Sequence, residues 1–234
     1  MSSSPKLLYV VALGCPKNRV DVESVVALAE RDGFTLTDDP TAADTILVAT
    51  CGLLSDAAQE SIKTTLELAQ VRQEGARVVV SGCLSQRWGD ELAQALPEAD
   101  VFVGTSDLEK IARALSEDVP RVDVGEASAD IARYPGRRPS ERPGSAYLKV
   151  ADGCSRKCAF CTIPAIRGPF QSRPIDEICD EARDLVAQGV KEIILVAQDL
   201  TSYGRESGRK ISRLAALLKA LARVDGLQWI RPLY

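Results

Sequence analysis

The chain has 234 residues, of which 45% are hydrophobic and 26% charged, and its formal net charge is −4. This length and composition are typical of a globular protein of one or two domains and exclude a disordered chain. The negative charge argues against general nucleic-acid binding and suits a basic partner. The absence of histidine excludes Cys/His zinc sites and catalysis that depends on a histidine.

Strands and helices are expected to alternate through a first domain, residues 1–118. Apolar runs predict strands at 7–13, 46–49, 78–81 and 101–103. Helices are predicted at 19–31, with Asn18 as N-cap, from 55 or 56 to about 73, at 87–96 and at 107–115. Strands separated by helices imply a parallel sheet with right-handed crossovers, so the fold class is α/β.

A linker is expected at residues 119–145, because prolines and glycines are frequent there and no hydrophobic period continues. Four arginines make the segment basic: Arg133, Arg137, Arg138 and Arg142. Such a segment suits either a solvated linker or a patch that contacts phosphate groups.

A second domain is predicted at residues 146–234. It begins with a strand at 147–150, and a helix follows Pro174. The remaining elements are expected in the order strand, helix, strand, at 192–197, 211–223 and 227–231. Three strands that alternate with helices indicate the opening part of a βα barrel, which we expect to be truncated in this chain.

Six of the seven cysteines fall into two sets of three. Cys154, Cys158 and Cys161 form a CxxxCxxC motif. The other set, Cys15, Cys51 and Cys83, is spread over the first domain, where each cysteine follows a predicted strand, adjoins a glycine and precedes a helix. Because the carboxyl ends of parallel strands meet at one edge of a sheet, we expect these three sulfurs to collect there.

Each set could hold an iron-sulfur cluster. Such clusters normally take four thiolates, so three would leave one iron without a protein ligand. For the CxxxCxxC set the alternatives are a zinc half-site, which the missing fourth cysteine disfavours, or core cysteines. For the other set the alternative is three small buried side chains. Cys179 lies inside a predicted helix and is expected to be structural.

The cysteines also bear on location. Seven cysteines without an even, closely spaced framework favour a reducing compartment. The apolar stretch near the amino terminus, about seven residues long, is too short to span a membrane and lacks a signal-peptide cleavage pattern. We therefore predict a cytoplasmic protein without a membrane partner.

Several motifs together resemble one family over nearly the whole chain, the radical S-adenosylmethionine methylthiotransferases. They are the CxxxCxxC spacing, residues 14–18 (GCPKN), 50–52 (TCG), 82–84 (GCL) and 198–199 (QD), with Tyr203 and Gly204. Pro16, Lys17 and the pair at 198–199 resemble the branch that modifies a ribosomal protein, whereas the other branch modifies tRNA. The chain departs from the pattern at Ala49, where the family commonly has asparagine.

The resemblance implies two 4Fe-4S clusters, one on each cysteine set, and S-adenosylmethionine bound to the open iron of the second. It implies that Phe160 lies near the adenine, although Phe160 could equally be a core residue. Gln198 and Asp199 are expected to contact cofactor or substrate, with a loop-structuring role as the alternative. No catalytic residue is assigned.

The implied reaction adds a methylthio group to the β-carbon of an aspartate in a small-subunit ribosomal protein. Electrons would come from a donor such as flavodoxin or ferredoxin. Two alternatives remain open at this point: the same chemistry on a tRNA adenosine, and a non-catalytic iron-sulfur protein that transfers electrons. Family members continue through the rest of the barrel into a small carboxyl-terminal β domain.

Overall fold

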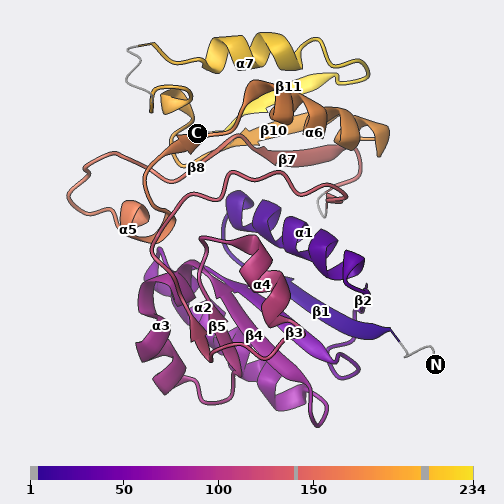
Figure 1. Ribbon diagram of the computed structural model, residues 1–234, viewed down its shortest axis with the longest axis vertical. Coiled ribbons are helices and arrows are strands. Elements are labelled where there is room, and N and C mark those ends of the chain that lie inside the picture. Colours follow the sequence, from indigo (N-terminus) through magenta and orange to yellow (C-terminus); the bar gives the residue numbers. More distant parts are fainter. Residues whose placement is uncertain (1–4, 140–141, 207–210, 234) are drawn as a thin grey trace. The chain divides into compact units, whose positions relative to one another are not determined.

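The computed structural model describes residues 5–139, 142–206 and 211–233, and it divides into two compact units, Met1–Glu126 and Ala127–Tyr234 (Figure 1). Each unit has its own parallel sheet. Within the described residues, no helix combines the length and the apolar character needed to cross a membrane.

The first unit is a six-stranded parallel sheet of order β2-β1-β3-β4-β5-β6. Its strands are β1 (Lys6–Ala12), β2 (Phe34–Leu36), β3 (Thr45–Thr50), β4 (Arg77–Gly82), β5 (Val101–Val103) and β6 (Val122–Asp123). Its helices are α1 (Pro16–Arg31), α2 (Ser55–Val71), α3 (Cys83–Ala95) and α4 (Leu108–Ala114). The predicted parallel α/β sheet is confirmed.

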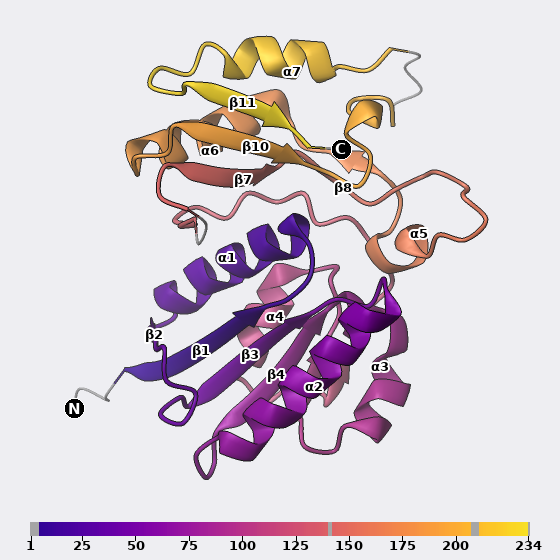
Figure 2. The same ribbon diagram turned by 180° about the vertical axis from the view of Figure 1, so that it is seen from behind.

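Helices cover both faces of this sheet, so its central strands are buried on both sides. Ile46 and Val48 of β3 point into a core that α2 and α3 complete. Leu47 and Ala49 point to the opposite face, which α1 and α4 cover (Figure 2). Alternate apolar residues therefore bury opposite faces, which explains why the central strands read as continuous apolar runs.

Two helices begin earlier than the sequence predicts. Cys15, not Asn18, is the N-cap of α1, and Pro16 occupies the first turn, where its missing N–H costs nothing. The Asn18 side chain instead donates from Nδ2 to the carbonyl of Leu13, 2.7 Å away. Helix α3 starts at Cys83 and kinks at Trp88, where φ is −131°.

The second unit contains a three-stranded parallel sheet of order β11-β10-β7. The strands are β7 (Ser145–Lys149), β10 (Glu192–Val196) and β11 (Trp229–Pro232), and a short antiparallel pair is formed by β8 (Ala151–Asp152) and β9 (Gln171–Ser172). The helices are α5 (Ile163–Arg167), α6 (Ile175–Ala187), the 3-10 helix η1 (Leu200–Ser202) and α7 (Leu214–Leu221). The predicted order β7, α6, β10, α7, β11 is confirmed.

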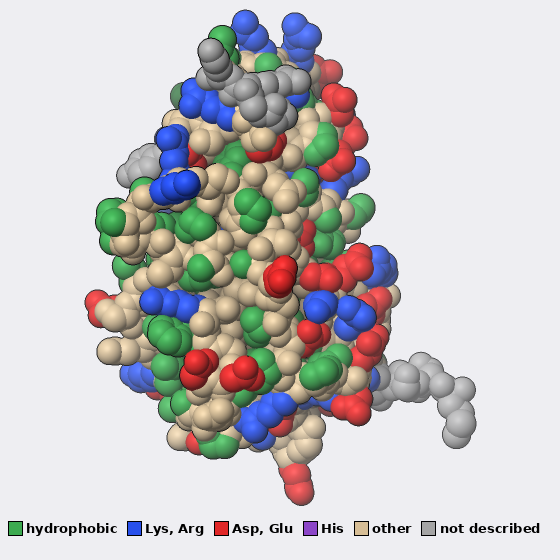
Figure 3. Space-filling model, turned by 60° about the vertical axis from the view of Figure 1, so that its left-hand side comes forward, with side chains coloured by type: hydrophobic (Ala, Val, Ile, Leu, Met, Phe, Trp, Pro, Cys, Tyr) green, Lys and Arg blue, Asp and Glu red, His purple; other side chains and the backbone are tan. Residues whose placement is uncertain are grey.

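The surface carries side chains of both charges. On the face shown in Figure 3, acidic and basic side chains both occur, and hydrophobic side chains lie among them singly or in small groups. Hydrophobic side chains that are scattered in this way are normal on the surface of a folded protein. This face therefore agrees with the balanced composition of the chain.

Two arginines of the segment expected as a linker are bound to helix α6. Arg133 pairs with Asp184, and Arg137 is buried against Glu181. Earlier in the same segment, β6 adds a strand to the first sheet. These parts of residues 119–145 are thus bound to folded elements. Neither of the two expected roles, a solvated linker or a phosphate-contacting patch, requires such binding.

Glu181 is a buried carboxylate between two arginines. Its Oε1 accepts from Nε and Nη2 of Arg137, at 2.9 and 2.6 Å, and its Oε2 lies 2.6 Å from Nη2 of Arg173. Burial acts to raise the pKa of Glu181, but Arg173 and Arg137 outweigh it and hold that pKa below its ordinary value. The three charges therefore stabilise the unit only as a set.

We expect Glu181→Ala to lower the free energy of unfolding by about 3–5 kcal/mol, because it leaves two buried guanidinium groups without their carboxylate. Urea titration followed by circular dichroism measures the loss. Asp180→Ala on the same helix is the matched control, since its partner Arg183 is exposed and such pairs contribute about 1 kcal/mol or less. Equal losses in the two variants would contradict this account.

Candidate functional site

Cys15, Cys51 and Cys83 lie at the carboxyl edge of the first sheet, just after the three neighbouring strands β1, β3 and β4. Cys51 and Cys83 directly follow β3 and β4, and Cys15 comes three residues after β1. The strand register pairs Ala12 with Ala49 and Thr50 with Gly82. The three turns therefore leave the sheet at the same level.

Glycines bring these turns into contact. A Cβ on Gly14 would lie 2.7 Å from Cβ and 3.2 Å from Sγ of Cys51. A Cβ on Gly52 would lie 2.7 Å from Cα of Leu84 and 2.8 Å from the carbonyl oxygen of Cys83. Only residues without a side chain permit this approach, so the glycine beside each cysteine sets how closely the turns meet.

The same edge receives the amino-terminal ends of helices. Cys15 is the N-cap of α1, Cys83 is the first residue of α3, and α2 starts at Ser55, shortly after Cys51. The partial positive charge at a helix start favours a negatively charged ligand there. Arg87 adds a cation nearby, because its Nη1 donates to the carbonyl of Gly52 at 2.9 Å.

In the second unit the CxxxCxxC loop runs from β8 to α5. Cys154 is buried, Cys158 is exposed and Cys161 is partly buried. The N–H of Cys154 donates to the carbonyl of Gly168 at 3.0 Å, and a turn joins the N–H of Cys161 to the carbonyl of Cys158 at 3.2 Å. The loop is thus anchored at its first cysteine and open at its second.

Gly153 makes the anchor possible. Its φ is +73°, and a Cβ there would lie 2.3 Å from the carbonyl oxygen of Pro169 and 2.7 Å from that of Gly168. Among the described residues, no group of three or more Cys, Asp or Glu side chains is arranged as a ready metal site. The cysteines fit a cluster by their donor chemistry, three thiols on glycine-lined turns, and by the backbone positions given above.

A buried carboxylate lies directly before this loop. Oδ1 of Asp152 accepts from the N–H of Gly153 at 2.9 Å and from Nε2 of Gln198 at 2.7 Å. Its Oδ2 faces Nζ of Lys149 at 3.3 Å and Nη1 of Arg167 at 3.5 Å. Burial raises the pKa of Asp152, but Lys149 and Arg167 outweigh burial and the net shift is downward. Sequence reasoning missed Asp152, although a charged residue in an apolar strand was a usable signal.

Asp199 joins the loop after β10 to the cysteine loop. It accepts from Nε of Arg156, from Ser202 Oγ and from Thr201 Oγ1, each at 2.6 Å. Burial raises the pKa of Asp199, but the hydrogen bonds from Ser202, Thr201 and Arg156 bring it to about 2. Asp199 is therefore a permanent anion at neutral pH, which suits an anchor and not a proton donor.

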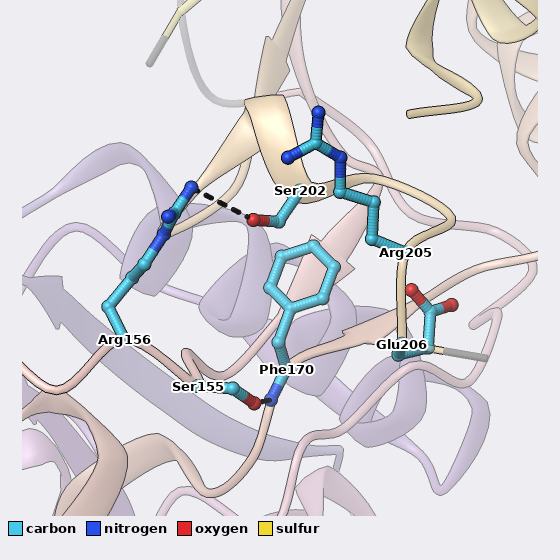
Figure 4. Close-up of a pocket in the computed structure, with 6 residues that line it drawn as sticks. All are labelled: Ser155, Arg156, Phe170, Ser202, Arg205 and Glu206. Atoms are coloured by element: carbon cyan, nitrogen blue, oxygen red, sulfur yellow. Dashed lines mark hydrogen bonds between the residues drawn. The ribbon is translucent and has the colours of Figure 1, made fainter. Parts of the chain in front are cut away.

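A cavity of about 260 Å³ opens beside the cysteine loop (Figure 4). The residues that line it are Ser155, Arg156, Phe170, Ser202, Arg205 and Glu206. The Phe170 ring points between the two arginines, and Arg156 reaches across to Ser202. None of these residues is among the predicted cofactor contacts.

Two predicted residues have clear surroundings. Phe160 is 91% exposed, so the alternative that it is a core residue is wrong. Cys179 is buried in the core of the second unit, where burial raises the pKa of its thiol. A structural role for Cys179 agrees with this position.

Gly82 offers a test of the close approach at the cysteine edge. A Cβ there would lie 2.6 Å from the carbonyl oxygen of Thr50, whereas Gly75 has open space, and both glycines have positive φ, +103° and +81°. Alanine is strained at both positions because of the positive φ, and more so at Gly82, whose ψ of −160° belongs to a region that glycine alone adopts readily. We expect Gly82→Ala to lower the free energy of unfolding, measured in urea, by about 1–3 kcal/mol more than Gly75→Ala does. Equal losses would show that the turns tolerate a side chain.

Residues 7–104 match the model described as "Uncharacterized protein family UPF0004", and residues 148–229 match the radical SAM superfamily. The whole chain is 44% identical to a protein of Geobacter sulfurreducens and 45% identical to one of Geotalea uraniireducens, both named ribosomal protein uS12 methylthiotransferase RimO. It covers 54% of each, so the chain spans about half the length of these relatives.

Solved structures share the fold at low identity. The radical S-adenosylmethionine methyltransferase TsrM from Kitasatospora setae, with cobalamin and a [4Fe-4S] cluster bound, aligns with a TM-score of 0.59 at 18% identity, over 94% of this chain and 53% of that one. The cobalamin-dependent S-adenosylmethionine radical enzyme OxsB aligns with a TM-score of 0.56 at 11% identity, over 96% and 38%. The two family models and the relatives that align over its full length show that the chain is similar to the radical S-adenosylmethionine methylthiotransferases.

Proposed function

We propose that this chain carries the cluster-binding and cofactor-binding parts of a methylthiotransferase that modifies a small-subunit ribosomal protein, at the β-carbon of an aspartate. The observation that carries the proposal is the pair of cysteine sets. Each set has three thiols, one fewer than the usual ligand number of a four-iron cluster. Each also lies within a segment that a family model matches, residues 7–104 and 148–229.

In this proposal Cys15, Cys51 and Cys83 hold one 4Fe-4S cluster, and Cys154, Cys158 and Cys161 hold the other. When bound, the clusters and S-adenosylmethionine would supply the radical chemistry that replaces a hydrogen atom of the substrate, together with the sulfur and the methyl group that replace it. The helix starts at the first set place partial positive charge beside the negative charge that a thiolate-ligated cluster would carry.

The protein's own residues position these groups. Arg156 lies between Cys154 and Cys158 in sequence, so its ion pair with Asp199 ties the cysteine loop to the loop after β10. Gln198, two residues after β10, is proposed to contact the cofactor. The exposed Phe160 ring is proposed to cover the adenine and shield it from water.

The proposed partners follow from the reaction. The substrate is a small-subunit ribosomal protein, which the names of the relatives support, and the net charge of −4 suits a basic protein. A one-electron donor such as flavodoxin or ferredoxin would reduce the cluster. The enzyme would encounter ribosomal proteins in the cytoplasm, and we propose that it acts there.

Iron counting tests the ligand assignment. After anaerobic reconstitution the chain should hold about eight irons, in two four-iron clusters. Cys154→Ala and Cys83→Ala should each lose about half, because each removes a ligand from a different set. Cys179→Ala should lose none, since that thiol lies in the core. Full iron content in Cys154→Ala or Cys83→Ala would refute the assignment.

Mass spectrometry tests the substrate. The protein, S-adenosylmethionine and a strong reductant are incubated in parallel with the small-subunit ribosomal protein and with tRNA. We expect the ribosomal protein alone to gain one methylthio group in place of a hydrogen, on an aspartate. A gain on tRNA adenosine would establish the alternative substrate. Two reducible clusters without any cleavage of S-adenosylmethionine would instead indicate an electron-transfer protein.

A further inference from the structure

In the side-chain amide of Gln198, the nitrogen has a hydrogen-bond partner, whereas the oxygen has none among the described residues. Its Nε2 donates to Oδ1 of Asp152 at 2.7 Å. Its Oε1 is buried and accepts no hydrogen bond in the part of the chain that the structure describes. Buried polar atoms are nearly always paired, so this oxygen indicates a donor group that a ligand brings.

The charges around Asp152 decide which way the amide points. Oδ2 of Asp152 faces Lys149 and Arg167, and Oδ1 accepts from the N–H of Gly153 as well as from Gln198. These partners of the carboxylate are all donors. If the Gln198 amide turned over, its oxygen would lie against a carboxylate oxygen, which is repulsive. The amide is held with its own oxygen turned away from Asp152.

We infer that Asp152 is a positioning residue that acts through Gln198. It fixes the amide so that Gln198 presents only an acceptor, and the matching ligand group is an N–H or O–H donor. The same carboxylate oxygen accepts from the N–H of Gly153. One atom therefore fixes both the orientation of the Gln198 amide and the backbone just before Cys154. The inference rests on the proposed function for the identity of the ligand, S-adenosylmethionine.

Exchanging the charge between the two positions tests the inference. In Asp152→Asn, we expect the oxygen of the introduced amide to turn toward Lys149 and Arg167, because two buried cations outweigh one backbone N–H. The nitrogen of the introduced amide then faces residue 198. The Gln198 amide turns over, so that its oxygen accepts from this nitrogen and its own NH2 group faces the donor group of the ligand. In the double variant with Gln198→Glu, one oxygen of the introduced carboxylate accepts from the amide at position 152 and the other again faces the ligand.

The measurement is the Kd of S-adenosylmethionine for the anaerobically reconstituted chain, by titration calorimetry. Asp152→Asn alone should weaken binding roughly tenfold to a hundredfold, the cost of leaving a buried polar group without its hydrogen bond. Gln198→Glu alone should also weaken it, because two carboxylates then face each other. The double variant should bind more tightly than either single variant. Additive losses would overturn the inference, since a merely structural role for Asp152 gives no rescue.

Two further measurements separate the possible failures. Gln198→Met leaves Asp152 and its cations in place, so it tests the acceptor even if Asp152→Asn does not fold; a loss of about tenfold or more is expected, and an unchanged Kd overturns the inference. Iron content, measured on each variant, should match that of the unaltered chain. If the unaltered, iron-loaded chain binds no S-adenosylmethionine, the proposed function itself is refuted.

Discussion

The candidate site in the first unit depends on how closely three chain turns approach one another at the edge of a parallel sheet. Strands β1, β3 and β4 are held in register by their hydrogen bonds, and helices on both faces prevent any strand from slipping. Gly14 and Gly52 then allow the turns to touch. Without these two glycines the cysteines would still follow their strands, but the turns that carry them would be pushed apart.

The second unit achieves its order by a different means, buried carboxylates that are matched by buried cations. Asp152 lies between Lys149 and Arg167, and Glu181 lies between Arg137 and Arg173. A buried charge without a partner lowers the stability of the fold. A paired one favours a single arrangement, because each partner must occupy a defined position. These sets lie in the interior of the unit, whereas Cys158 and Phe160 are exposed. The cysteine loop therefore combines a fixed beginning with an accessible middle.

Much of the fold could be predicted because hydrophobic periodicity is a local property. Short windows of sequence predict the alternation of strand and helix and the position of the cysteines after strands. That alternation in turn predicts that the strands run parallel. The errors lie at helix starts and in short strands. Asn18 has the chemistry of an N-cap, yet Pro16 allows α1 to begin at once after Cys15. Strands of two or three residues, such as β2 and β6, are too short to show a period.

Taken alone, the sequence determined which residues are proposed to carry the chemistry, two sets of three cysteines. It also determined the α/β framework around them and the motifs that resemble one enzyme family. The tertiary structure decided how that chemistry is held. The pairing of Asp152 with Gln198 and that of Arg156 with Asp199 join residues that lie far apart in the chain. Spacing in a sequence reports local geometry only, whereas a buried hydrogen bond exists only once the folded chain brings donor and acceptor to the same point.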